Sequence, residues 1–352
     1  METFECKECG FKSWTSIVVH IEMEHASLAE NAPASYEGNV LALYLSKHNA
    51  RGSDLCRMSE DDVIRIANVE MPRGPGGLGV PKINPAHHFG ANVREIVADI
   101  LENRRVLLTG HTGSGKTSMI QQIAARSNYP VVRVNLNGQM PVSDFVGMWT
   151  VRGGEMVWCD GILPAAMRSG AWLILDEIDF AEPSILSVLN GVLERDGFLT
   201  IQEKGGEKVI PHENFRIFAT ANSVGCMASF RHLYQGTDVM NEAFIDRWRV
   251  YFVDYLPAVE ETKILMAATG LSKALCEKVV KVAGAIRESF SKEEVQCTFS
   301  LRRMIDWCEI MRRQGENGVT NPVISAEAAI LNKISPEDSE VVKGIIYRVV
   351  NS

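Results

Sequence analysis

Long apolar runs are missing from this sequence: none approaches the roughly 20 residues that a membrane-spanning helix requires. The opening residues, METFECKECG, lack the basic and apolar regions of a secretion signal. Basic residues are outnumbered, 36 Lys and Arg against 44 Asp and Glu, so a net charge of −8 leaves no broad positive field for nucleic acid. These absences predict a soluble, cytoplasmic protein with no membrane partner and no general affinity for nucleic acid.

Cysteines are also sparse, eight in 352 residues, and only Cys6 and Cys9 stand close together, which excludes a disulfide framework. Hydrophobic residues make up 46% and charged residues 23% of the chain, close to ordinary globular usage. At about 150 residues per domain, this length predicts two or three folded domains.

The amino end carries a pattern typical of a zinc site. Two cysteines in a C-x2-C pair are followed, after ten residues, by two histidines in H-x4-H spacing, at Cys6, Cys9, His20 and His25. Two thiolates and two imidazoles can close a tetrahedral Zn²⁺ site, although the common gap between the pairs is about 12 residues. The alternative is an ordinary helical hairpin with accidental Cys and His. Residues 1–27 carry a net charge of −3 from the acidic and basic residues, which favours docking on a protein over binding DNA.

The next segment reads as a linker with short helices. One helix is predicted at residues 39–49, and Ser59 with Asp62 forms a capping box that predicts another near residues 60–70. Residues 71–81, MPRGPGGLGVP, are too rich in Gly and Pro for regular structure and are interpreted as the entry to the main domain.

A phosphate-binding loop follows a short apolar run at Arg105–Thr109. The motif GxxxxGK[ST] is complete at Gly110, His111, Thr112, Gly113, Ser114, Gly115, Lys116 and Thr117. In such a loop the backbone N–H groups surround a phosphate at a helix N-terminus, Lys116 reaches the β and γ oxygens, and Thr117 offers its hydroxyl to Mg²⁺. A glycine-rich connector is the alternative, but the strand before the motif and the helical pattern after it favour nucleotide binding.

A second apolar run, Trp172–Leu175, ends in Asp176 and Glu177. In a parallel sheet these carboxylates lie at the carboxyl edge of a strand, where ligands bind. Asp176 is expected in the Mg²⁺ shell, and Glu177 is expected to polarise an attacking water. Asp179 is interpreted as a local cap or ion-pair partner.

Further polar residues flank later strand-like runs. Asn222 closes the run that begins at Phe215, where its side chain could orient the water beside Glu177. Arg247 precedes another strand-like run, and Arg302 opens a helix. Arginines stabilise the charge on a transferring phosphoryl group, although a single arginine is more often a solvated surface residue.

Taken in order, these motifs resemble those of the AAA+ ATPases, and within them the MoxR branch and the CobS type, the ATPase subunits of aerobic cobaltochelatases. The stretches that carry the resemblance, from about residue 81 to 310, are NRRVLLTGHTGSGKT, VVRVNLN, DFVG, DGILPAA, FRIFATANSVG, LYQGTDVMNEAFIDRWRV, DYLP and FSLRRMIDW. The resemblance implies that Asn222 is sensor 1, Arg247 the arginine finger and Arg302 sensor 2. Arg303 and Arg249 are adjacent alternatives.

The resemblance further implies ATP and Mg²⁺ as cofactors and a hexameric ring with ATP between subunits, so that Arg247 reaches a neighbour's nucleotide. It implies a partner with a von Willebrand A domain, whereas a zinc finger, with Zn²⁺, is a departure from the CobS pattern. The leading hypothesis is an ATP-hydrolysing ring motor that remodels a partner complex, most specifically a cobaltochelatase-like assembly. A nucleic-acid-associated motor targeted by the finger, and a nucleotide-controlled scaffold, are the alternatives.

The predicted fold is α/β, a P-loop core with a parallel sheet followed by an α-helical lid. The resemblance also implies two hairpin insertions that face the ring pore or a partner, and residues 147–161 and 197–210 are the candidates; plain surface connections are the alternative. The predicted domains are a zinc finger at 1–27, a linker at 28–80, the nucleotide-binding core at 81–256 and the lid at 257–352.

Overall fold

A computed structural model describes residues 63–136, 138, 140–222, 241–316 and 321–350, together with two short strands near the amino end. These strands, β1 (Phe4–Glu5) and β2 (Lys12–Ser13), pair antiparallel. The predicted zinc ligands and the helix predicted at residues 39–49 lie outside the described residues.

A parallel sheet forms the centre of the described fold, with strand order β13-β5-β12-β9-β6. Its strands are β5 (Val106–Thr109), β6 (Val131–Asn135), β9 (Trp172–Asp176), β12 (Arg216–Ala221) and β13 (Arg249–Phe252). Both β5 and β9 are buried along their whole length, because strands of a parallel sheet that is covered on both faces read as continuous apolar runs. The predicted α/β core with a parallel sheet is confirmed.

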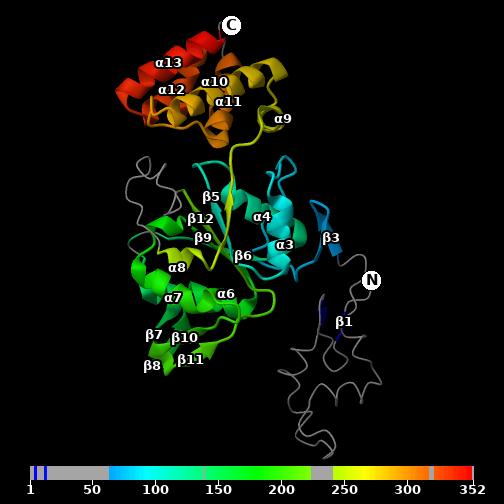
Figure 1. Ribbon diagram of the computed structural model, residues 1–352, viewed down its shortest axis with the longest axis vertical. Helices are drawn as coiled ribbons and strands as arrows, with labels where there is room; N and C mark the ends of the chain where they lie inside the picture. The colour runs from blue at the N-terminus through cyan, green and yellow to red at the C-terminus, as the bar shows by residue number, and fades with distance from the viewer. Residues whose placement is uncertain are drawn as a thin grey trace, which may run out of the picture.

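Helices cover the two faces of this sheet. One face carries α3 (Val93–Leu101) and α4 (Lys116–Ser127), and the other carries α5 (Val142–Val146), α6 (Ile162–Ser169) and α7 (Pro183–Leu193). Side chains alternate between the faces along each strand, so Leu108 joins the core on the α3 and α4 side while Leu107 joins the core on the other. The result is a three-layer arrangement (Figure 1).

The helix predicted near residues 60–70 is wrong. The chain instead forms a hairpin of β3 (Val63–Ile66) and β4 (Val69–Pro72). Ala67 and Asn68, in the turn, both have positive φ, which matches the twist of a two-residue hairpin and not a helix. Ile66 and Met71 are buried in the core with α3 and α4, so the packed α/β unit includes residues before residue 81.

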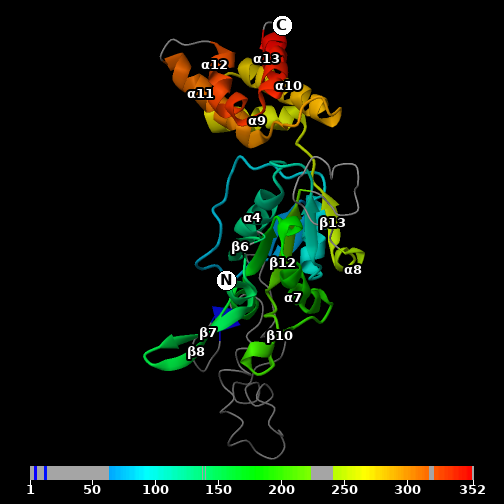
Figure 2. The ribbon, with the colours of Figure 1, turned by 90° about the vertical axis from the view of Figure 1, so that its left-hand side faces the viewer.

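Both predicted hairpin insertions are present. They are formed by β7 (Gly147–Arg152) with β8 (Glu155–Asp160), and by β10 (Leu199–Ile201) with β11 (Glu207–Val209). Trp149 connects them, since its Nε1 donates to the carbonyl of Glu203 at 2.9 Å. The hairpins lie at the end of the core opposite the carboxyl-terminal helices (Figure 1), and β7 and β8 project away from it (Figure 2).

The carboxyl-terminal region is helical, as predicted. Its helices are α9 (Ala258–Thr269), α10 (Lys273–Ser291), α11 (Leu301–Glu316), α12 (Pro322–Ala329) and α13 (Pro336–Val350). They enclose a core of their own in which Phe299 and Trp307 are fully buried. Among the helices of the described ranges, none combines the length and the apolar character of a membrane-crossing segment.

Candidate functional site

The loop between β5 and α4 folds around the side chain of Lys116. Helix α4 begins at Lys116, and its N-cap, Gly115, has a φ of 94°. The Lys116 ammonium donates to the carbonyls of Gly110 at 2.7 Å and His111 at 3.0 Å, and to Oδ1 of Asn222 at 3.1 Å. The loop and the end of β12 therefore meet at one ammonium group, beside a helix N-terminus that favours anions.

Burial acts directly on this ammonium group. Lys116 is only 7% exposed, and desolvation lowers its pKa from 10.5 to about 8. The nearby carboxylates of Asp179, Asp176 and Glu177 act in the opposite direction and raise it. An anionic phosphate at the loop would favour the charged form of Lys116 further.

Asp176, the last residue of β9, is the centre of a second set of contacts. Its Oδ1 accepts hydrogen bonds from the hydroxyls of Thr117 at 2.7 Å and Thr220 at 2.8 Å. Its Oδ2 forms an ion pair with Arg133 of β6. The hydroxyl of the loop and the carboxylate of β9 thus lie side by side, as predicted, and both are the hard oxygen donors that Mg²⁺ prefers.

Glu177 and Asn222 follow β9 and β12. Glu177 has a φ of 57°, and its backbone N–H donates to the Thr220 hydroxyl at 3.3 Å. Asn222 Oδ1 lies 3.4 Å from the Thr112 hydroxyl, and its backbone N–H donates to the carboxylate of Asp179 at 3.1 Å. The sequence predicts local pairing for Asp179, but this buried carboxylate holds the backbone of Asn222, 43 residues along the chain.

Tyr255 joins the loop to the helical region. Its hydroxyl donates to the carbonyl of Thr112 at 3.2 Å and lies 2.7 Å from the hydroxyl of Thr298. Its ring stacks on His111, with an interplanar angle of 6°, and lies 3.7 Å from the guanidinium carbon of Arg287. Partial burial lowers the pKa of His111, which favours the neutral imidazole in this stack.

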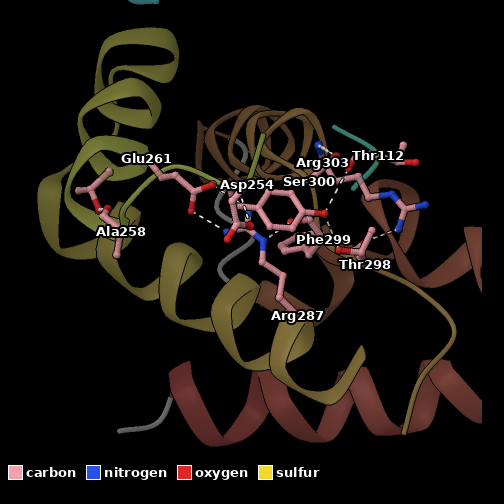
Figure 3. A network of polar contacts seen from close by, with 11 residues as sticks. Thr112, Asp254, Ala258, Glu261, Arg287, Thr298, Phe299, Ser300 and Arg303 are labelled. Atoms are coloured by element: carbon pink, nitrogen blue, oxygen red, sulfur yellow. Dashed lines mark hydrogen bonds and ion pairs between the residues drawn. The ribbon is translucent and has the colours of Figure 1, made fainter. Parts of the chain in front are cut away.

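The guanidinium of Arg287 is itself held by two further groups. It binds both carboxylate oxygens of Glu261, at 2.8 and 2.9 Å, and donates to the carbonyl of Phe299 at 2.8 Å (Figure 3). Glu261 is 2% exposed, so the pair is a buried, bidentate one between α9 and α10. Through the ring of Tyr255, these contacts fix the position of α9 and α10 beside the loop.

A cavity of about 370 Å³ lies between the loop and this helical region. Gly113, Gly115 and Arg302 contribute to its lining. Arg303, the adjacent alternative for sensor 2, instead donates to the carbonyl of Thr298 at 2.8 Å. Of the two adjacent arginines, Arg302 is thus the one that lines the cavity beside the loop.

Arg247 does not line the cavity beside the loop. It follows the short helix α8 (Glu242–Ile245) and pairs with Glu194, and both residues line a separate cavity of about 680 Å³ to which Arg249 also contributes. The structure therefore brings together the predicted residues of the loop, Asp176, Glu177 and Asn222, but it does not place Arg247 among them.

Three residues of this site were not predicted from the sequence: Thr220, Arg133 and Tyr255. Thr220 and Arg133 lie on β12 and β6, and only the strand order places both strands next to β9. Tyr255 lies in the stretch DYLP, which carries part of the family resemblance, but the sequence assigned it no role. For metals, no group of three or more His, Cys, Asp or Glu side chains suited to hold an ion occurs among the described residues.

The sequence matches known protein families in both the sheet core and the helical region. Residues 105–248 match the AAA domain of the dynein-related subfamily, and residues 261–351 match the CbbQ/NirQ/NorQ C-terminal family. The aerobic cobaltochelatase subunit CobS of Sinorhizobium sp is 36% identical over 245 residues, which cover 66% of this chain and 73% of CobS. The chain belongs to the MoxR-type AAA ATPases. The resemblance predicted from the sequence is confirmed at this level.

Other relatives of this ATPase differ widely in size. The protein NorQ of Paracoccus denitrificans is 27% identical over 273 residues, covering 78% of this chain and 94% of NorQ. Midasin of Dictyostelium discoideum is 34% identical over 189 residues, which cover 53% of this chain and only 3% of midasin. The ATPase unit is thus shared by short chains and by one that is far longer.

Gly113→Ala is expected to weaken nucleotide binding by this ATPase roughly tenfold or more, since strain of about 1–3 kcal/mol at the loop corresponds to such a change. Gly113 has a φ of 76°, and a methyl group there would overlap the Ser300 side chain at the start of α11. The measurement is the Kd of a fluorescent ATP analogue.

Gly154→Ala is the matched control for this substitution. Gly154 also has a positive φ, 89°, but it lies in the turn between β7 and β8, and no atom lies within 4 Å of the added methyl group. It should leave the Kd unchanged. Equal Kd values for wild type and Gly113→Ala would show that the contact between loop and lid is irrelevant to binding.

Proposed function

We propose that this protein binds and hydrolyses ATP with Mg²⁺ at the loop, as a ring motor that remodels a partner complex. The observation that carries the proposal is the contact of the Thr117 hydroxyl with the Asp176 carboxylate, at 2.7 Å, beside the buried Lys116. A phosphate-binding loop, two hard oxygen ligands and a cavity under a helical lid are what phosphoryl transfer from a nucleotide requires.

Thr117 and Asp176 fit Mg²⁺ by their chemistry, and they are the residues that would hold it. When bound, the ion would supply positive charge that offsets the negative charge developing on the transferring phosphoryl group. Arg133 forms an ion pair with the same carboxylate. When the ion binds, Asp176 would have to contact both groups or lose its ion pair with Arg133.

The other side chains have separate tasks in this proposal. Lys116 binds the β and γ oxygens, and Glu177 polarises the attacking water. Asn222, held by Asp179 and already bound to Lys116, serves as sensor 1 and orients the water. Arg302 approaches the γ-phosphate from the lid as sensor 2.

Arg247 is proposed to act on the nucleotide of an adjacent copy. Its separation from the loop within one chain supports this assignment, as does the AAA family to which the chain belongs. A closed ring, with six subunits as the resemblance implies, would repeat this contact at every subunit boundary. Such an arrangement makes hydrolysis depend on assembly.

The partner is proposed to be a cobaltochelatase-like assembly, with a von Willebrand A subunit as the direct contact. The relative CobS carries a cobaltochelatase role in its name, and its match spans 73% of its length. Residues 1–27, if they bind Zn²⁺ through the two cysteines and two histidines, would add a small acidic module suited to a protein partner.

The test uses Glu177→Gln protein, loaded with ATP and Mg²⁺, as bait in extract of the native cell, with mass spectrometry of what co-purifies. Lys116→Ala protein, expected to bind nucleotide about a hundredfold more weakly or worse, is the matched control bait. Nucleotide-dependent recovery of a von Willebrand A or large chelatase subunit is the expected result. Recovery of nucleic-acid enzymes or other proteins, with neither chelatase partner, would contradict the cobaltochelatase role and leave the ATPase itself standing.

A further inference from the structure

The surroundings of Arg247 hold its guanidinium in a defined orientation. Its Nε donates to Oε1 of Glu194 at 2.8 Å, and its NH2 lies 2.7 Å from the same oxygen. Its NH1 donates to the carbonyl of Ala243, in the preceding helix α8. One carboxylate and one carbonyl thus fix the plane of a side chain that is 29% exposed.

The donors of this guanidinium are only partly used. An arginine carries five N–H groups, one on Nε and two on each terminal nitrogen. The contacts with Glu194 and Ala243 leave at least one N–H on each terminal nitrogen of Arg247 without a partner among the described residues. Two such N–H groups form the fork that binds phosphate oxygens in a bidentate manner.

Glu194 is itself anchored to the core. It directly follows α7, in which Val192 and Leu193 are buried. The guanidinium of Arg105 donates to the carbonyl of Glu194 at 2.7 Å and to that of Val192 at 3.3 Å. Because Arg105 directly precedes β5, its contacts tie the position of Glu194 to the central sheet.

We propose that Glu194 is a positioning residue for Arg247, orienting its free N–H groups toward the nucleotide phosphates held by an adjacent copy of the chain. This inference rests on the proposed function, in which Arg247 serves a neighbour's site. The Glu194 side chain is 57% exposed, and exposed ion pairs add little to folding stability. Its contribution is therefore to the orientation of Arg247, and a misplaced group of this kind costs catalysis far more than it costs stability.

The test compares four variants: Glu194→Ala, Glu194→Gln, Arg247→Ala and the double variant Glu194→Ala/Arg247→Ala. Glu340→Ala is the matched control, because Glu340 forms an exposed ion pair with Lys343 at 2.8 Å, remote from Arg247 on α13. The readouts are kcat and KM for ATP hydrolysis, the Kd for nucleotide, the assembly mass in solution and the thermal unfolding midpoint.

Glu194→Ala is expected to lower kcat roughly tenfold to a hundredfold, with the nucleotide Kd, the assembly mass and the unfolding midpoint unchanged. Glu194→Gln, which keeps an acceptor for Nε, should recover part of the lost kcat. The double variant should be no slower than Arg247→Ala, because a positioning residue has no effect once its target is gone. The control should match wild type.

Three results would overturn the inference, in distinguishable ways. If Arg247→Ala lowers kcat while Glu194→Ala has wild-type or higher kcat, Glu194 does not position Arg247, and the proposed function stands. If Arg247→Ala hydrolyses ATP at the wild-type rate, the assignment of Arg247 to the neighbour's nucleotide fails, and the role of Glu194 fails with it. Multiplicative effects in the double variant would also contradict the inference, since they would show that the two residues act independently.

Discussion

Lys116→Ala is expected to reduce nucleotide affinity by about a hundredfold or more, because it removes the buried charge that we propose binds the phosphates. Lys116 is 7% exposed and donates to Gly110, His111 and Asn222. The substitution therefore removes the group that links the loop to the end of β12 as well as the charge. The measurement is the Kd for ATP and for ADP by calorimetry.

Lys273→Ala is the matched control, since Lys273 is 71% exposed at the start of α10. Because burial already lowers the pKa of Lys116 to about 8, loss of this ammonium should not destabilise the fold through lost charge. A Kd within threefold of wild type would contradict the assigned role of Lys116.

Glu177→Gln is expected to slow hydrolysis by roughly a hundredfold to ten-thousandfold while nucleotide remains bound. Glu177 lies beside Asp176 at the end of β9, and its backbone N–H donates to Thr220, so an amide of the same shape should keep this geometry. What the amide cannot do is accept a proton from water. Single-turnover phosphate release, with a parallel Kd measurement, separates hydrolysis from binding.

Glu182→Gln serves as the control for Glu177→Gln. Glu182 is the exposed N-cap of α7, a few residues further along the same segment, and its side chain makes no cap hydrogen bond. It should hydrolyse ATP at the wild-type rate. If Glu177→Gln also turned over at the wild-type rate, the water-activating residue would have to be sought elsewhere in the site.

The sequence was most informative where a function depends on consecutive residues. The loop from Gly110 to Thr117 can be recognised from its motif alone. In such a motif the backbone supplies the expected phosphate contacts, and Lys116 and Thr117 supply the charge and the hydroxyl. Asp176 can be recognised almost as easily, because an apolar run that ends in a carboxylate indicates the carboxyl end of a buried strand. The structure confirms that the apolar run before each motif is a buried strand, β5 and β9.

The sequence was misleading where local and tertiary preferences differ. Ser59 and Asp62 predict a helix from capping chemistry alone, yet residues 63–72 form a hairpin. Ile66 and Met71 gain more from burial against α3 and α4 than a short, isolated helix gains from its cap. A cap is a local signal, and it has little weight when a neighbouring surface offers apolar burial.

By itself, then, the sequence determined the α/β core, the GxxxxGK[ST] loop, the carboxylates at the end of β9 and the helical carboxyl-terminal region. Each of these depends on the order of residues within one segment, where periodicity and motif spacing act. Only the tertiary structure decided that Thr220 and Arg133 hold Asp176, that Tyr255 joins the loop to the lid, and that Glu194 holds Arg247. The physical reason is that these contacts join segments whose proximity is set by strand order and helix packing, and neither is written in any single stretch of the chain.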